Sequence, residues 1–256
     1  MKLWYCSDSN LPIDSNNLTF IMKTLKTILK FIGLFILIKC VFFAINHFSG
    51  KNEISSISDA HSLENNSQLK PHLGFHRIMV GYGLSVEIPE SWHILSNAQV
   101  QKIKNTASQI DNNQNKTTSL AANSSEDPKR NESVFRVSFT DANFTENDLI
   151  HASSADIAEV CTVMNKSLGD SLPQAGTSLT KAATCRVGKL ANLPAFISEY
   201  ERQSVNKDGN WKVTIYQIPL NSKMAIVTAS YSLNSEVAYQ AISSTIKSIS
   251  ITNNFK

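Results

Sequence analysis

The stretch that decides the fold is PAFISEYERQSVNKDGNWKVTIYQIPLNSKMAIVTASYSL, residues 194–233. It contains three runs rich in β-branched and aromatic residues: 194–203, 211–220 and 223–233. Such runs are typical of β-strands, and Asp208 and Gly209 are the residues that favour a tight hairpin turn between the first two. Because strands joined by short turns are antiparallel, this stretch predicts three neighbouring antiparallel strands.

A helix is expected before these strands, over residues 153–170. Its apolar side chains recur at helical spacing, as they do in a helix that packs one face on a core. Ser153 or Ser154 is suited to be its N-cap, and Gly169 is expected to end it.

Further helices are expected on either side of this region. Residues 235–249 show the same apolar spacing, with Asn234 as the predicted N-cap and a short strand near Ile251. Residues 96–110 also fit a helix, in which Ser96 and Gln99 form a capping box.

Two more strands are predicted nearer the N-terminus, where apolar residues alternate at 84–88 and 134–139. The polar run 111–133 between them is predicted to be a long loop inserted in the domain. Strands in short-turn order together with helices indicate the α+β class, here an antiparallel sheet flanked by helices.

An apolar segment, residues 28–46, precedes this domain. Nineteen helical residues span about 28 Å, close to the hydrocarbon thickness of a bilayer. Lys39 costs about 3 kcal/mol on the insertion scale, but the thirteen Leu, Ile, Phe and Val residues around it outweigh that cost. The segment therefore predicts one N-terminal transmembrane helix. It is interpreted as an uncleaved signal anchor, because no pair of small residues suited to cleavage follows it closely.

The flanking residues predict the orientation and the division of the chain. Lysines precede the apolar segment, so the positive-inside rule places the N-terminus in the cytoplasm and the later residues outside. Residues 1–27 are then a cytoplasmic tail, or a start-site extension upstream of Met22. Residues 47–73 are rich in Ser, Asn and charge and predict a flexible linker, and residues 74–256 form the domain.

The net charge of +3 lies entirely around the apolar segment, because residues 1–46 carry five lysines and two acidic residues. The remaining residues carry equal numbers of basic and acidic side chains. Because residues 47–256 together carry no net charge, they show no sign of the basic face that nucleic-acid binding requires, so no nucleic-acid partner is expected.

Several of these patterns together resemble a known family. YGLSVEIPESWHIL at residues 82–95, KLANLPAFISEYER at residues 189–202 and the final helix that runs into SISI resemble the PsbP/Mog-type fold. Within it they are similar to the bacterial DcrB-like secreted proteins, over about residues 79–251. The resemblance implies an antiparallel sheet with helices on both sides. It also implies an accessory or binding role without a shared set of catalytic residues.

Cys161 and Cys185 are 24 residues apart in the predicted extracytoplasmic part. Thiols in such compartments are often oxidised, so the pair is a candidate disulfide. Cys161 also lies on the apolar stripe of its helix, where a free cysteine packs well. Both interpretations stay open at the level of the sequence.

Tyr200, Arg202, Trp211 and Tyr216 cluster on one predicted hairpin. Tyrosine, tryptophan and arginine are enriched at binding interfaces, so these four residues form a candidate interface. The alternative is that the aromatic rings pack in the core.

No motif for a catalytic or cofactor site is present, and no cofactor or metal is expected. His72 and His76 have the spacing of two metal ligands on a helix, but two ligands do not make a zinc site, and they are interpreted as solvated linker residues. Glu87 and Glu90 flank a turn and are interpreted as surface carboxylates. An enzyme would need a pocket in which His93 or His151 meets a carboxylate or a serine.

The function predicted from these observations is non-enzymatic. The protein is expected to be a single-pass protein of the bacterial inner membrane, with its C-terminal domain in the periplasm and a binding or accessory role toward an envelope protein partner. The alternatives are an unrecognised envelope hydrolase and a structural tether in an envelope complex.

Overall fold

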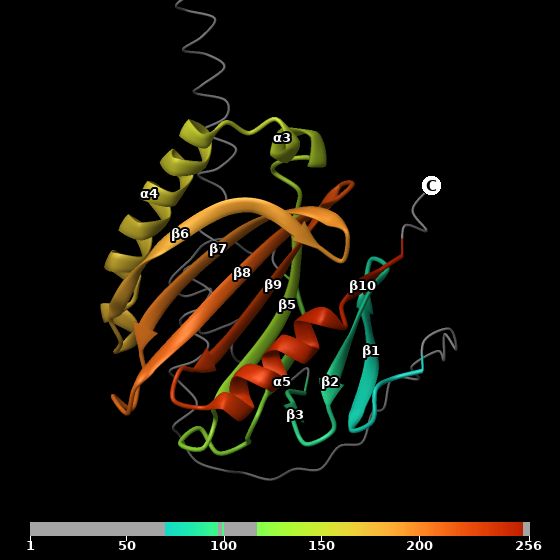
Figure 1. Ribbon diagram of the computed structural model, residues 1–256, viewed down its shortest axis with the longest axis vertical. Coiled ribbons are helices and arrows are strands. Elements are labelled where there is room, and N and C mark those ends of the chain that lie inside the picture. Colours follow the sequence, from blue (N-terminus) through green and yellow to red (C-terminus); the bar gives the residue numbers. More distant parts are fainter. Residues whose placement is uncertain (1–69, 97–98, 100–116, 253–256) are drawn as a thin grey trace, which may run out of the picture.

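The structure of the chain is a computed structural model that describes residues 70–96, 99 and 117–252. Within these residues, seven strands form the main sheet in the order β3-β4-β5-β9-β8-β7-β6 (Figure 1). Every neighbouring pair in it is antiparallel. Its strands are β3 His93–Ile94, β4 Thr117–Asn123, β5 Ser133–Asp141, β6 Leu179–Leu190, β7 Leu193–Gln203, β8 Asn210–Leu220 and β9 Lys223–Ser232.

A smaller sheet has the order β1-β2-β10, and all its pairs are also antiparallel. Its strands are β1 Phe75–Gly81, β2 Leu84–Pro89 and β10 Ser250–Ile251. The described helices are α3 Glu146–Ile150, α4 Ser154–Ser171, the short 3₁₀ helix η1 Pro173–Ala175 and α5 Glu236–Lys247. The α+β class and the antiparallel sheet predicted from the sequence are confirmed.

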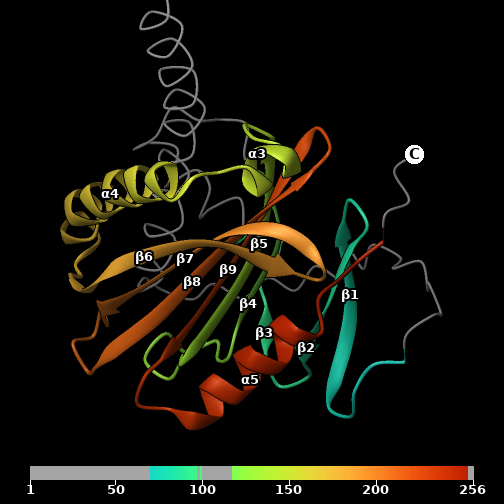
Figure 2. The ribbon, with the colours of Figure 1, turned by 45° about the horizontal axis from the view of Figure 1, so that its top comes forward.

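Both faces of the main sheet are covered, because its central strands carry buried residues at successive positions. On β7, Phe196 and Tyr200 lie in a core with Leu168 of α4. Ala195 lies in a second core, on the opposite face, with Ile242 of α5. Figures 1 and 2 show α4 across the β6 end of the sheet and α5 beside the small sheet. Period-two alternation therefore sends neighbouring residues of one strand into two different cores.

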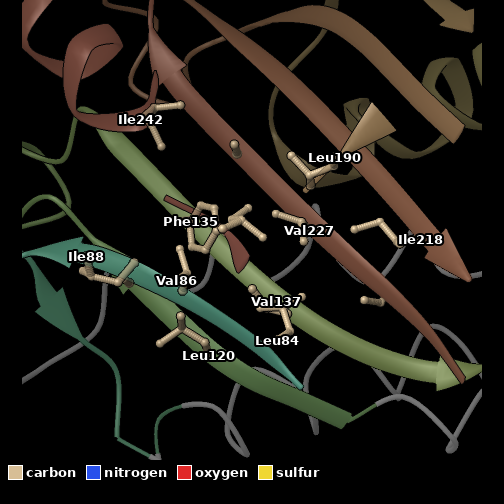
Figure 3. Close-up of a cluster of buried hydrophobic side chains, with 14 of the residues drawn as sticks. Leu84, Val86, Ile88, Leu120, Phe135, Val137, Leu190, Ile218, Val227 and Ile242 are labelled. Atoms are coloured by element: carbon tan, nitrogen blue, oxygen red, sulfur yellow. The ribbon is translucent and has the colours of Figure 1, made fainter. Parts of the chain in front are cut away.

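The core on the α5 side joins the two sheets. Leu84, Val86 and Ile88 of β2 are completely buried. Figure 3 shows them next to Phe135 and Val137 of β5, which belong to the same cluster. Each such side chain contributes about 1.5–3 kcal/mol by leaving water, so this contact holds the small sheet on the main one.

The N-cap of α4 is Ser153, whose side chain accepts from the backbone N–H of Asp156, as the sequence predicts. The predicted end at Gly169 is wrong, because the helix continues to Ser171 and is followed by η1. The turn ends at Gly176, whose φ of 72° is in the left-handed region that favours glycine.

The cap of the last helix also differs from its prediction. Ser235, not Asn234, is the N-cap of α5 and accepts from the N–H of Ala238. Asn234 instead donates from Nδ2 to the carbonyl of Asp208 at 3.4 Å. The hairpin between β7 and β8 therefore occupies the side chain that was expected to cap the helix.

The predicted loop at 111–133 is wrong in part, because β4 lies within it and pairs with β5. Strand β6 has no counterpart in the sequence prediction, since its exposed edge carries Lys, Thr and Arg among small residues. Most of the helix predicted at 96–110 lies outside the described residues. Its capping box is present: Gln99 accepts from the N–H of Ser96 at 2.7 Å, and Ser96 accepts from that of Gln99 at 3.3 Å.

The predicted transmembrane helix at 28–46, the tail at 1–27 and most of the linker at 47–73 also lie outside the described residues. Among the helices of the described part, none is long and apolar enough to cross a membrane.

Candidate functional site

The side of the main sheet that faces α4 carries a group of polar residues between the apolar ones. These polar face residues are buried, and they come from three strands: Ser198, Tyr200, Arg202, Gln217, Thr228 and Ser230. Register explains why they share one face. Arg202 pairs with Trp211, Tyr200 pairs with Val213, and Val213 pairs with Ser230.

Arg202 is the charged member of this group, and its residue is only 1% exposed. Its guanidinium carbon lies 5.2 Å from the ring centroid of Trp211, a cation–π distance. Its Nη1 donates to the carbonyl of Gln203 at 3.1 Å. Its Nε has no hydrogen-bond partner within the described part of the chain. Burial lowers the pKa of Arg202, and the neighbouring Tyr200 opposes that shift.

A second arginine on the same face is held differently. Arg136 of β5 donates from Nη1 to the carbonyls of Ala122 at 2.7 Å and Phe135 at 2.9 Å. Its Nη2 donates to Oδ1 of Asn123 at 2.6 Å. Burial lowers the pKa of Arg136 to about 9. Three protein acceptors surround this guanidinium, whereas the guanidinium of Arg202 has one.

The candidate interface of Tyr200, Arg202, Trp211 and Tyr216 is not a surface in the structure. The first three are at most 8% exposed and lie on the α4 face. Tyr216 lies on the opposite face, where it packs at the edge of the second core. Adjacent positions on a strand point to opposite sides, so residues 211 and 216 are separated by the sheet.

Cys161 of α4 and Cys185 of β6 are joined in a disulfide, with Cα atoms 5.7 Å apart. Asn165, one helical turn after Cys161, strengthens the same contact. Its Nδ2 donates to the carbonyl of Ala183 at 3.0 Å, and its Oδ1 accepts from the N–H of Ala183 at 2.6 Å. This amide makes the pair of bonds that a neighbouring strand would make, so α4 is fixed over the edge strand β6.

Glu87 corrects the sequence interpretation, because it is not a surface carboxylate. It is 1% exposed and accepts from Nη2 of Arg77 at 2.6 Å. Its other oxygen lies 2.6 Å from Nδ1 of His72. Burial alone would raise the pKa of Glu87, but the hydrogen bonds from His72 and Arg77 outweigh burial and hold this pKa below its usual value.

The signal that could have found this cluster is the pairing of β1 with β2, which places Arg77 opposite Glu87. HLGFH at residues 72–76 falls at the boundary between the predicted linker and the predicted domain, so the sequence does not predict strand β1. His72 is exposed along most of its side chain, but it lies on Glu87 and is not a free linker residue.

Of the two histidines considered for catalysis, His93 meets a surface carboxylate and His151 a backbone carbonyl. Nδ1 of His93 lies 2.9 Å from Oε1 of Glu126, whose side chain is 78% exposed. Nδ1 of His151 lies 2.9 Å from the carbonyl of Asn147. In the described part of the chain, no serine, threonine or cysteine is hydrogen-bonded to a histidine ring, and no group of three His, Cys, Asp or Glu residues is placed to hold a metal.

Comparison with known proteins gives structural likenesses only. No protein-family model and no curated protein matches the chain. A solution structure of cyanobacterial PsbP from Synechocystis sp. PCC 6803 matches 75% of this chain and 99% of its own, at 10% identity and a TM-score of 0.43. The crystal structure of LpqN, involved in cell envelope biogenesis of Mycobacterium tuberculosis, matches 70% of this chain and 91% of its own, at 13% identity and a TM-score of 0.39.

A crystal structure from Bacteroides thetaiotaomicron matches 72% of this chain but only 51% of its own length, at 7% identity and a TM-score of 0.39. The PsbP structure among these likenesses agrees with the PsbP-type resemblance of the sequence, and the DcrB-like assignment stays a prediction.

Proposed function

We propose that this protein is a membrane-anchored, extracytoplasmic binding or accessory protein of the bacterial cell envelope, and not an enzyme. The observation that carries the proposal is the disulfide between Cys161 and Cys185. Disulfides form and persist in oxidising compartments, and are rare where thiols are kept reduced. The apolar segment at 28–46, with its preceding lysines, independently supports an outside location for the domain.

A binding role is supported by how the described polar groups are used. The buried carboxylate of Glu87 is occupied by Arg77 and His72, which suits a structural cluster. The polar face residues around Arg202 contain no thiol and no carboxylate, so they lack the usual acid–base and nucleophilic groups apart from hydroxyls. The polar face residues can donate hydrogen bonds to a ligand and accept hydrogen bonds from it.

Location is tested by fusing alkaline phosphatase, which is active only outside the cytoplasm, to the C-terminus of the full chain. The proposal expects active fusions that stay in the membrane fraction after high-salt and carbonate washes. A matched fusion that lacks residues 1–46 should be inactive. An inactive full-length fusion would contradict an extracytoplasmic domain, and release by carbonate would contradict the anchor.

The binding role is tested by affinity capture of the tagged full-length protein from detergent-solubilised envelopes, followed by in vitro reconstitution with the captured protein. Turnover of an envelope component by the purified protein, abolished by one point substitution, would overturn the non-enzymatic part of the proposal.

A further inference from the structure

Arg202 is a buried cation for which the described part of the chain provides no acidic partner. Its residue is 1% exposed, and the neighbouring ionisable group that acts on it is Tyr200, not a carboxylate. Buried charges in proteins are normally paired, because an isolated ion in a medium of low dielectric constant is costly. The burial of this guanidinium therefore requires a physical reason.

The contacts of Arg202 leave its Nε–H without a partner among the described residues. Nη1 is used by the carbonyl of Gln203, and one face of the plane is used by Trp211. The edge formed by Nε and Nη2 presents two parallel N–H groups, which match the two oxygens of a carboxylate or a phosphate.

Other polar atoms on the same face also have no partner. The side-chain oxygens of Ser198, Gln217 and Ser230 are buried without a hydrogen bond to any residue of the described part. A native domain contains few buried polar atoms of this kind, and each calls for an explanation. Here they lie on the face that carries Arg202 but farther along the strands, since Gln217 pairs with Phe196, six residues from Arg202.

Arg136 and Arg202 differ in how their guanidinium groups are hydrogen-bonded. Both arginines lie on the same face, Arg136 partly buried and Arg202 fully buried, and neither has a carboxylate partner in the described residues. Arg136 is satisfied by three oxygens, two from the neighbouring strand β4 and one from the preceding residue of its own strand. Arg202 has one such oxygen and an aromatic ring. A purely structural role explains Arg136 fully, but leaves the Nε side of Arg202 unexplained.

We propose that Arg202 binds the anionic group of a ligand, a carboxylate or a phosphate, at the α4-facing side of the sheet. Trp211 fixes the plane of the guanidinium. The site assigns an anionic ligand to the binding role proposed above. It therefore depends on that role. The ligand site is tested on purified protein, so this test can fail while the fusion experiment supports the proposed location. The fusion experiment can likewise fail while the ligand test succeeds.

The test is a titration of the full chain, purified in a non-ionic detergent, with sodium acetate, with inorganic phosphate or with sodium chloride at matched ionic strength. We expect acetate or phosphate to raise the melting temperature in a saturable way, with a matching signal in titration calorimetry, and chloride to give no saturable effect. A response to acetate alone identifies a carboxylate ligand, and a response to phosphate alone identifies a phosphate ligand.

The variant R202K keeps the positive charge but cannot donate two parallel hydrogen bonds to an anion, so it should weaken anion binding by about tenfold or more. R130K is the matched control, because the side chain of Arg130 is 84% exposed and belongs to a loop. Two results would overturn the site: no saturable response of the wild-type protein to either oxyanion, or equal affinities of R202K and the wild type. The wild-type titration decides the question even if R202K does not fold.

Discussion

Removing the disulfide between Cys161 and Cys185 tests how α4 is held on the sheet. We consider the double substitution C161A/C185A in a background of C6S/C40S, which contains no other cysteine. The bridge closes a loop with a sequence separation of 24 residues. In the chain-entropy model, a loop of this length stabilises the folded state by about 3.5 kcal/mol.

That magnitude converts into a measurable change in the melting temperature. For a domain of this size, 1 kcal/mol corresponds to about 2–4 °C, so the double variant should melt roughly 7–14 °C below its background. Circular dichroism of both proteins, without reductant, measures the difference. Adding reductant should lower the melting temperature of the background by a similar amount and leave that of the double variant unchanged.

The reasoning is refuted if reductant does not change the melting temperature of the background. It is also refuted if the background protein, unfolded without reductant, shows two free thiols on titration with a maleimide. Either result would mean that α4 is held by packing and by Asn165 alone, and would remove the main support for an oxidising compartment.

Three further predictions concern stability and use the same melting assay. Because the pKa of Glu87 is lower in the folded state than its reference value of 4.5, its contribution is fully present above that value and is lost as the pH falls through the folded pKa. E87Q should therefore destabilise the protein by about 2–3 kcal/mol at pH 7 and show a shallower loss in acid; equal acid profiles would argue against the cluster. G209A should destabilise the protein, because Gly209 has a φ of 151° and an added Cβ would lie 2.5 Å from Nδ2 of Asn234. An unchanged melting temperature would show that the turn adapts. L168A should lower the free energy of unfolding by about 2–5 kcal/mol, since Leu168 is fully buried. V163A, on the exposed side of α4, should lower it by less than about 1 kcal/mol. Similar losses in the two variants would contradict the assigned face of the helix.

Much of the domain is predictable from local sequence, because its patterns are strong. Strands β7, β8 and β9 alternate clearly and are joined by short turns, and Ser153 with Asp156 marks the start of α4. Strand β6 escapes such a prediction. It is an edge strand with one partner, so half of its residues are exposed and the strand carries little apolar periodicity.

The candidate site was less predictable than the fold. The alternation of β7 places Tyr200 and Arg202 on one face, but it does not say whether that face is covered. Arg202 is buried by the tertiary packing on this side of the sheet, and no local pattern of the sequence contains that fact. In the same way, Glu87 looks like a surface residue until β1 places Arg77 opposite it.

By itself, the sequence determined the central antiparallel strands, the start of the long helix and the charge balance of the domain. These properties follow from residues that are close together along the chain. The tertiary structure decided which side of each strand is covered, that Cys161 meets Cys185, and that Arg202 is enclosed without an acidic partner among the described residues. Those outcomes depend on contacts between segments far apart in the sequence, and periodicity within one segment carries no information about the segment that packs on it.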